Sequence, residues 1–411
     1  MSYLDEEVEP VSPIRRFSTI LLAAATTALS LTPAVTAGPA HGCVSSVPFT
    51  SGTEGYDTFR IPAVVRAADG ALVAFAEGRR DSAGDSGAIQ TVSRTSRDGG
   101  CTWGPLSVVD SNGVATAGNP TPVLARDGDL VLLTVHNGLV SEKQIMSGQA
   151  SDQDTRRVFV LRSRDNGRTW SPARDITADT KLPGWRWYAT GPGHATLLRH
   201  GPHAGRIVVP ANHSSSPPAG SPDVGTEAKY YGGHDLYSDD DGRTWHIGFT
   251  DDRTDGVVAP NETTATELPD GTLYFSSRNQ GSAAEHRVDG YSADGGKTLV
   301  RPYQVQPSLS GTKVEGSVLQ TTVPWLLLYS GPADPATRTV MQLRLSTDRG
   351  HTWRPGRTLT TGPAAYSDLV QADPATVGIL YETGTAGPYE KIVFERVGLA
   401  PGQLGNAPAR R

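Results

Sequence analysis

The sequence predicts an all-β fold assembled from repeats, and three observations lead to that prediction. Glycine and proline are plentiful, with 46 and 30 residues in a chain of 411. Long apolar stripes with the 3.6-residue period of a helix are absent from the sequence. Short apolar runs instead recur between turn signals, which is typical of many short strands joined by turns.

The first repeat is the eight-residue motif Ser-x-Asp-x-Gly-x-Thr-Trp, in which Leu299 replaces Trp once. Its five copies begin at Ser96, Ser163, Ser238, Ser292 and Ser346. We expect its Asp to accept hydrogen bonds from N–H groups of a turn, and its Gly to supply a positive φ. Its Trp would cover neighbouring apolar surface. Because each repeat needs such a turn, we assign the motif no catalytic role.

The second repeat is a turn followed by a short apolar strand, and it occurs six times. The copies read "ADGALVAFAE", "RDGDLVLLTVHN", "HAGRIVVPANH", "PDGTLYFSSRN", "TVPWLLLYSG" and "DPATVGILYETG". Another strand candidate, such as "FRIPAVV" or "GPGHATLL", precedes each turn. The pattern predicts a six-bladed β-propeller of four-stranded antiparallel blades over residues 44–398. The last unit lacks the motif, so we expect the segment near "VSSVPF" to supply its missing strand.

The two ends of the chain read differently from the repeats. Residues 1–37 contain "RRFSTILLAAATTALSLTPAVTA", in which two arginines precede an apolar run and small residues. This order predicts a secretory signal peptide cleaved after Ala37, and a short membrane anchor is the alternative. We therefore expect a secreted, extracellular protein without a membrane span in its mature form. Residues 399–411 are interpreted as a short C-terminal tail, and the expected state is a monomer.

The chain contains two cysteines, Cys43 and Cys101. In an exported protein two cysteines usually pair, so we predict a disulfide, with two buried free thiols as the alternative. Neither cysteine has metal-ligand spacing, and we expect no metal or organic cofactor. The charge is mixed and the net value is -6, which gives no basic footprint for nucleic acid.

In the predicted propeller, the starts of the first strands and the ends of the second strands meet on one face. The polar residues at those places are Arg60, Arg79, Asp85, Asn119, His194, Glu262, Arg278, Glu315, Arg338, Tyr366 and Glu382. Several arginines at one channel mouth would repel one another unless they bound an anion, and arginine suits bidentate recognition of a carboxylate.

These segments together resemble the exo-sialidases (neuraminidases) of bacteria and animals. The resemblance rests on "YDTFRIPAVV", five Asp boxes (the BNR repeats), "NETTATEL", "SSRN" and "YETG". It covers roughly residues 44–398. The ordered set of site residues is more specific than the Asp boxes, which non-enzymatic propellers also carry.

The resemblance implies a role for each candidate side chain. Arg60, Arg278 and Arg338 match three arginines that bind the substrate carboxylate, and Glu382 matches the carboxylate that steadies the first of them. Tyr366 matches the nucleophile and Glu262 its partner. Asp85 matches the acid/base, although Asp81 in the same segment "GRRDSAGDSG" is the alternative. Arg79 matches a further substrate-binding arginine of some members.

The implied activity is that of a glycoside hydrolase, a retaining exo-α-sialidase acting on sialylated glycans. A tyrosine is neutral until it reacts, so it approaches an anomeric carbon that carries a carboxylate without charge repulsion, and a neighbouring Glu can take its proton. The alternatives are a non-catalytic sialoglycan-binding Asp-box propeller, a trans-sialidase, and a glycosidase for a related nonulosonic acid. Linkage and N-acyl preference stay open.

Two groups have two interpretations each. The aromatic residues Trp185, Trp187 and Tyr188 in "LPGWRWYATG" either form a wall for the remaining glycan or pack within their own loop. His194 in "GPGHATLL" either lines the pocket or makes a structural hydrogen bond.

Overall fold

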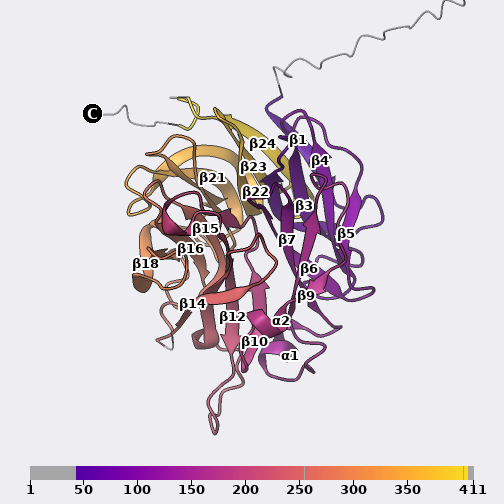
Figure 1. Cartoon of the computed structure of the whole chain (residues 1–411), viewed down its shortest axis with the longest axis vertical. Helices are drawn as coiled ribbons and strands as arrows, with labels where there is room; N and C mark the ends of the chain where they lie inside the picture. Colours follow the sequence, from indigo (N-terminus) through magenta and orange to yellow (C-terminus); the bar gives the residue numbers. More distant parts are fainter. Residues whose placement is uncertain (1–42, 254, 401, 406–411) are drawn as a thin grey trace, which may run out of the picture. The chain divides into compact units, whose positions relative to one another are not determined.

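The computed structural model describes residues 43–253, 255–400 and 402–405, all within the unit Ala40–Arg411. The predicted signal peptide and most of the predicted C-terminal tail lie outside these residues. The described chain is almost entirely β-structure (Figure 1). Its helical elements are short: α1 (Glu142–Met146), α2 (Thr177–Thr180), and the 3-10 turns η1 (Gly201–His203) and η2 (Ala228–Tyr230).

Hydrogen bonding joins the described strands into four sheets. The first contains β2 (Thr58–Arg66), β3 (Leu72–Arg79), β4 (Ile89–Ser96), β5 (Ser107–Ser111), β6 (Thr116–Leu124), β7 (Leu130–Asn137), β8 (Arg157–Ser163) and β9 (Arg174–Asp175). The second contains β10 (Trp185–Thr190), β11 (Thr196–Leu197), β12 (Ile207–Ser215), β13 (Tyr231–Ser238) and β14 (His246–Asp252).

The third sheet is formed by β15 (Pro260–Glu267), β16 (Leu273–Asn279), β17 (His286–Ser292) and β18 (Arg301–Ser310). The fourth contains β1 (Ser45–Thr50), β19 (Ser317–Gln320), β20 (Leu327–Pro332), β21 (Thr339–Ser346), β22 (Arg354–Asp373), β23 (Thr376–Thr383) and β24 (Lys391–Gly398). Here β1 pairs antiparallel with β24, which confirms that the N-terminal segment supplies the last unit's outer strand.

Two features explain why the sheets are four where the repeats are six. A single parallel bridge between Ile89 and Thr116 joins the first two units. The 20-residue strand β22 pairs with β21 along its first half and with β23 along its second half, so it joins the last two units. Contacts among the innermost strands run from β2 to β6, β10, β15, β19, β22 and back to β2, which closes a ring.

The third unit departs from the predicted strand "GPGHATLL", of which only Thr196–Leu197 is a strand. The preceding segment forms β10, and both β10 and β11 pair with β12. The interruption falls at Gly191–Pro192–Gly193, where both glycines have positive φ. Pro192 has no N–H to donate to the ladder, so the strand is split there.

Each of the five Asp boxes follows the same register. The first residue of each unit's second strand pairs with the Ser that opens the box: Leu72 with Ser96, Leu130 with Ser163, Ile207 with Ser238, Leu273 with Ser292 and Leu327 with Ser346. Along β3 the opposite end is Arg79, which pairs with Ile89 and with Thr58. Seven residue steps place these ends about 23 Å apart. We call them the box end and the site end.

The box turns have the predicted hydrogen bonds. In the first box, Asp98 accepts from the N–H groups of Cys101 and Thr102 at 3.0 and 2.9 Å, and from the Thr102 hydroxyl at 2.6 Å. Gly100 has φ +92°, and a Cβ there would lie 2.1 Å from the Phe394 ring. Glycine is therefore required both by backbone conformation and by close approach to the last unit.

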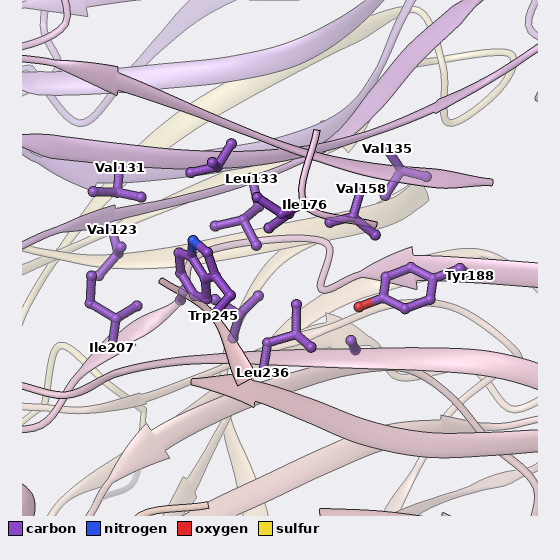
Figure 2. Packing of buried hydrophobic residues seen from close by; sticks show 14 of the residues in the cluster. Val123, Val131, Leu133, Val135, Val158, Ile176, Tyr188, Ile207, Leu236 and Trp245 are labelled. Atoms are coloured by element: carbon purple, nitrogen blue, oxygen red, sulfur yellow. The ribbon is translucent and has the colours of Figure 1, made fainter. Parts of the chain in front are cut away.

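The box aromatic residues pack between neighbouring units. Trp245 lies in a core cluster with Val131 of β7 and with Ile207 and Leu236 of the next sheet (Figure 2). Trp103 packs edge-on against Phe394, with ring centroids 5.5 Å apart. The boxes thus stabilise the contacts between successive units.

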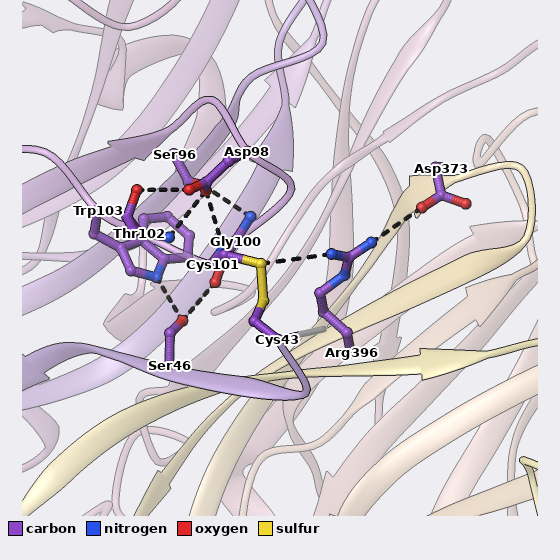
Figure 3. The surroundings of a disulfide bond; sticks show 10 residues. All are labelled: Cys43, Ser46, Ser96, Asp98, Gly100, Cys101, Thr102, Trp103, Asp373 and Arg396. Atoms are coloured by element: carbon purple, nitrogen blue, oxygen red, sulfur yellow. Dashed lines mark hydrogen bonds and ion pairs between the residues drawn. A yellow bond between two sulfur atoms is a disulfide. The ribbon is translucent and has the colours of Figure 1, made fainter. Parts of the chain in front are cut away.

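A disulfide joins Cys43 to Cys101, as predicted (Figure 3). Next to it, Ser46 of β1 donates to the carbonyl of Gly100 at 2.5 Å and accepts from the Trp103 indole at 2.8 Å. The first box is therefore tied both covalently and by hydrogen bonds to the strand that completes the last unit.

Candidate active site

The structure brings the predicted site residues together at the site end. One cavity is lined by seven of them: Arg60, Arg79, Asp85, Glu262, Arg278, Arg338 and Tyr366. The eighth, Glu382 on β23, is fully buried beside Arg60. Residues more than 300 positions apart in sequence therefore form one site.

Several of these side chains lie at irregularities in the pairing of the innermost strands. The pairing register of the innermost strands shifts between Arg60 and Ala63 in β2, between Gly118 and Thr121 in β6, between Pro260 and Thr263 in β15, and between Ala364 and Ser367 in β22. Such bulges re-aim the side chains at the irregularity. Arg60, Asn119, Glu262 and Tyr366 all lie at these shifts.

Arg60 is held in a fixed orientation by Glu382. Its Nε and Nη2 donate to the two carboxylate oxygens at 3.0 and 3.2 Å. The same carboxylate accepts from the backbone N–H groups of Ile61 and Tyr366 at 2.8 and 3.1 Å. Such a saturated bidentate pair positions the guanidinium and leaves its Nη1 directed away from Glu382.

Two further arginines approach Tyr366 from other strands. The Nη1 of Arg278 donates to Glu262 at 2.8 Å and to the Tyr366 hydroxyl at 3.3 Å, while its buried Nε has no partner. Arg338 lies over the Tyr366 ring at 5.6 Å and donates to the Tyr389 hydroxyl at 2.6 Å. Three guanidinium groups thus converge with donors to spare, which suits a bound carboxylate.

Tyr366 and Glu262 are in direct contact in the cavity. The Tyr366 hydroxyl donates to Oε1 of Glu262 at 2.5 Å. Burial is the largest influence and raises the pKa of Tyr366 well above its usual range, and the Glu262 charge acts in the same direction. The neighbouring arginines Arg278, Arg60 and Arg338 oppose this shift without reversing it. The phenol is therefore neutral, with a proton acceptor already in contact.

Asp85 lies in the loop after β3, and its side chain is 65% exposed. Its carboxylate is 2.8 Å from Nη1 of Arg79 and 3.8 Å from Nη1 of Arg60. Partial burial raises the pKa of Asp85, but the two guanidinium groups lower it by more, and the net pKa is below its usual value. Asp81 is exposed and lies outside the lining of the cavity. The geometry thus places Asp85, and not Asp81, in the cavity.

Arg79 is buried and fixed by several bonds. It is 2% exposed, pairs with Glu77 at 2.6 Å, and donates to the carbonyl oxygens of Ala83 and Gly84 at 2.5 and 3.0 Å. These bonds fold the Asp85 loop back over the cavity.

The cavity also contains side chains that sequence reasoning missed, chiefly Arg156 and Glu142. Arg156 directly precedes β8, the third strand of its unit. Third strands begin at the same face as first strands, so including their starts would have found this residue. Glu142 lies in α1, an insertion for which the repeats gave no signal, and it accepts from the Tyr231 hydroxyl at 2.8 Å.

The structure distinguishes between the two interpretations given for the aromatic residues of 182–191 and for His194. Trp187 lines the cavity, whereas Trp185 and Tyr188 belong to a buried core cluster. His194 bonds Asp368 through Nδ1 at 2.7 Å and borders a different cavity. Its hydrogen bond is structural, and it does not reach Tyr366.

Within the described part of the chain, no helix combines the length and apolar character that a membrane crossing requires. The described side chains also include no cluster of three or more His, Cys, Asp or Glu residues arranged to bind a metal.

Comparison with known proteins identifies relatives of this chain. The sequence pattern of the BNR repeat-like domain family matches residues 69–379. A sialidase of Micromonospora viridifaciens is 31% identical over 360 residues, which cover 82% of this chain and 52% of that protein. An exo-alpha-sialidase of Aspergillus fumigatus is 28% identical over 382 residues, covering 84% of this chain and 85% of that protein. The chain therefore spans about half the length of the Micromonospora relative.

Among solved structures, the leech intramolecular trans-sialidase is similar in fold, with a TM-score of 0.72 and 17% identity. The similarity covers 89% of this chain and 72% of that chain. The described chain thus has the fold of the sialidase-like proteins, which are β-propellers.

Proposed function

The chain belongs to the sialidase family with BNR repeats, and from this membership we propose that it is a retaining exo-α-sialidase that removes terminal α-linked sialic acids from glycans. The observation that carries the proposal is the 2.5 Å contact between Tyr366 and Glu262 beneath three converging arginines. A module that only bound sialic acid would need the arginines but not a buried phenol in contact with a proton acceptor.

In the proposed first step, Arg60, Arg278 and Arg338 bind the carboxylate on C1 of the sugar. The Tyr366 oxygen then attacks the anomeric carbon C2 while Glu262 takes the phenolic proton. The bond from C2 to the glycosidic oxygen breaks, and Asp85 gives that oxygen its proton. The products are the free glycan and a sialosyl–tyrosine adduct.

In the second step, Asp85 takes a proton from water, whose oxygen attacks C2 on the face vacated by the glycan. The C2–Tyr366 bond breaks and Glu262 returns the proton to the phenolate. Two inversions give net retention of anomeric configuration. Every proton removed is returned, and each proposed step uses only side chains of this chain and water.

The charge around Asp85 has a consequence for this mechanism. In the free protein Arg79 and Arg60 keep Asp85 ionised, which is the wrong form for an acid. A substrate carboxylate bound at Arg60 would offset part of that positive charge and raise the pKa of Asp85. Substrate binding would thereby prepare the acid form.

The architecture that we propose for this site is a propeller of six blades. The groups are β2–β5, β6–β9, β10–β14, β15–β18, β19–β21 with the first half of β22, and the second half of β22 with β23, β24 and β1. The closed cycle of contacts among innermost strands supports this grouping. We also propose a secreted monomer that acts on sialylated glycoproteins, glycolipids or oligosaccharides.

Transfer to the substrate's own hydroxyl is the second candidate, because the leech intramolecular trans-sialidase shares the fold. Hydrolysis and transfer share the first step and differ in whether water or a sugar hydroxyl attacks the adduct. Product analysis by NMR after incubation with α2,3-, α2,6- and α2,8-linked substrates separates free sialic acid from an anhydro product, and reports linkage preference and anomeric outcome.

Covalent labelling tests the proposal directly. A fluorinated sialosyl fluoride, which slows breakdown of the adduct, should label the wild-type protein on Tyr366, and Glu262→Ala should slow the labelling. A label on Glu262 or Asp85 would refute the tyrosine mechanism while keeping a glycosidase. Sialoside binding without label or turnover would support a binding module.

A further inference from the structure

The three arginines that we propose to bind the substrate carboxylate are not held in the same way. Arg60 and Arg278 each have a carboxylate partner, with oxygen atoms at 3.0 and 2.8 Å. Arg338 has no ion pair among the residues that the structure describes. Its Nη1 donates to the Tyr389 hydroxyl at 2.6 Å, and its Nη2 donates to the carbonyl oxygen of Lys313 at 3.2 Å. The orientation of Arg338 therefore depends on a phenol, where the other two arginines depend on carboxylates.

The ring of Tyr389 also contacts a second arginine of this set. The Arg60 guanidinium lies over the ring, 4.0 Å from its centroid. Such a cation is attracted by the negative charge density of the aromatic face. The ring packs against a buried cluster that includes Ile61 and Tyr366. One phenol thus contacts Arg60 through its face and Arg338 through its hydroxyl, so it links the two guanidinium groups.

The backbone around Tyr389 is held by hydrogen bonds, although the residue lies in the loop 384–390 between β23 and β24. The Glu390 carboxylate accepts from the N–H groups of residues 385–387 at 3.0, 2.6 and 3.1 Å. The Tyr389 carbonyl accepts from the Ser51 hydroxyl at 2.7 Å, and the Glu390 carbonyl accepts from the Ser51 N–H at 3.0 Å. These bonds fix the place at which the loop presents the phenol.

A fixed phenol would prepare Arg338 for a carboxylate. An arginine side chain samples many rotamers, and ordering it when a ligand binds costs conformational entropy. The guanidinium has five N–H donors, of which Tyr389 and Lys313 take one each, so three are left for a ligand. A phenol also orders the arginine without bringing a second carboxylate next to that of the substrate.

We propose that Tyr389 is a positioning residue of the carboxylate clamp formed by Arg60, Arg278 and Arg338, and that it acts through Arg338. This inference rests on the proposed glycosidase function and adds a residue to it. Tyr389 lies outside the lining of the cavity, so its effect on a substrate passes through the arginines. The clamp holds the carboxylate before and during the reaction, so losing the hydroxyl should raise KM and leave kcat nearly unchanged.

The test measures the affinity of 2-deoxy-2,3-dehydro-sialic acid by calorimetry, together with KM and kcat for a 4-methylumbelliferyl α-sialoside. Tyr389→Phe removes the hydroxyl and keeps the ring against Arg60. It should weaken the inhibitor and raise KM by about 2- to 10-fold, the value of one hydrogen bond, with kcat within about twofold of the wild type. Tyr389→Leu also removes the aromatic face and should weaken the inhibitor further.

A double-mutant cycle shows whether Tyr389 acts through Arg338. In the Arg338→Ala background, Tyr389→Phe should change inhibitor affinity by less than about twofold, because no guanidinium is left for the hydroxyl to order. A hydroxyl that only stabilised its loop would weaken binding by the same factor in both backgrounds.

The matched control is Tyr381→Phe, which removes one hydroxyl from the neighbouring strand β23. The Tyr381 hydroxyl donates to Glu395 at 3.4 Å and lies outside the cavity. This variant should keep the wild-type inhibitor affinity and KM. Thermal unfolding of both variants reports any loss of stability separately from the change in binding.

The inference is overturned if Tyr389→Phe keeps the wild-type affinity and KM, if it lowers kcat alone, or if its effect is the same with and without Arg338. Each of these results leaves the glycosidase proposal standing, because the wild type still binds and turns over. A wild type that neither binds the inhibitor nor cleaves the substrate overturns both proposals. Inhibitor binding without turnover refutes the glycosidase alone, and the calorimetric comparison of the variants then decides the role of Tyr389.

Discussion

The charged residues at the box end and at the site end differ in where their hydrogen-bond partners come from. At the box end, Asp98 takes its hydrogen bonds from residues Ser96 to Thr102 of its own turn. At the site end, some partners come from other units, as in the pairing of Arg60 with Glu382 across 322 positions. The box carboxylates are satisfied locally, whereas the site leaves buried donors on Arg156 and Arg278 unmet.

For these residues the difference separates a charge that stabilises its own turn from a charge that is available to a ligand. A carboxylate whose hydrogen bonds are all made within its own turn stabilises the fold and has no free acceptor for a ligand. A group positioned by distant strands, with donors to spare, gains most when a ligand binds. Substituting the same type of residue at each end should therefore affect activity at the site end and stability at the box end.

The largest effect is expected for tyrosine. Tyr366→Phe removes the attacking oxygen and should lower kcat by about a thousandfold or more. The matched change at the box end is Tyr274→Phe, whose buried hydroxyl accepts from Trp353 at 3.3 Å. It should cost about 1 kcal/mol of unfolding free energy and leave kcat intact. Steady-state kinetics and thermal unfolding of both variants check the pair, and equal kinetic loss in both would refute the assignment.

Aspartate should give the next largest contrast. Asp85→Ala should slow substrates with poor leaving groups by about 10² to 10⁴-fold, and activated aryl sialosides much less, because a good leaving group needs little protonation. Asp81→Ala should be mild in both assays. Asp98→Ala should lower the melting temperature without changing the ratio of the two substrates. The reverse ranking of Asp85 and Asp81 would move the acid to Asp81.

For arginine, the readout is affinity for the inhibitor 2-deoxy-2,3-dehydro-sialic acid. Arg278→Ala should weaken binding by about 10- to 150-fold, the value of a charge-assisted hydrogen bond. The box-end control is Arg206→Ala, since Arg206 is buried and likewise pairs with a carboxylate, that of Asp239, at 2.8 Å. Calorimetry should find inhibitor affinity unchanged in that variant, and a loss there would mean that the two ends are wrongly assigned.

The smallest effect concerns pH. In Asp165 slight burial raises the pKa, but hydrogen bonds from Thr169, Ser163 and Arg168 lower it by more, to about 2. Because the folded pKa is depressed, the stabilisation is present above the usual value of 3.8 and is lost as pH falls toward 2. The melting temperature of Asp165→Asn should lie about 1–3 °C below that of the wild type at pH 5.

Glu315, near the site, should show the opposite sign. Burial, reinforced by Asp368, raises its pKa well above the usual range, and its Oε1 has no partner. A raised carboxyl pKa means that its contribution to stability declines as pH rises above about 4.5. The melting temperature of Glu315→Gln, measured relative to that of the wild type, should therefore be higher at pH 7 than at pH 4. Parallel pH profiles for the Asp165 and Glu315 variants would contradict the comparison of the two ends.

Much of the site could be predicted because the repeats show which end of each strand lies on which face of the fold. Once strand ends are assigned to faces, Arg60, Arg278 and Tyr366 are seen to meet, and the structure brings them to one cavity. The same scheme missed Arg156, because only the starts of first strands and the ends of second strands were considered. It missed Glu142 because an inserted helix has no counterpart in the other units.

The sequence by itself determined what depends on neighbours along the chain. The five box turns and the strands around them follow from short-range hydrogen bonding and positive-φ glycines. The pairing of Cys43 with Cys101, 58 positions apart, could be predicted only because the chain contains two cysteines, and the structure decided it. Only the tertiary structure decided the bulges that aim Glu262 and Tyr366 at each other, and the cover of Trp187 by Arg156. Those contacts join different strands of a closed ring, so their geometry is set by the packing of all units together and by no single segment.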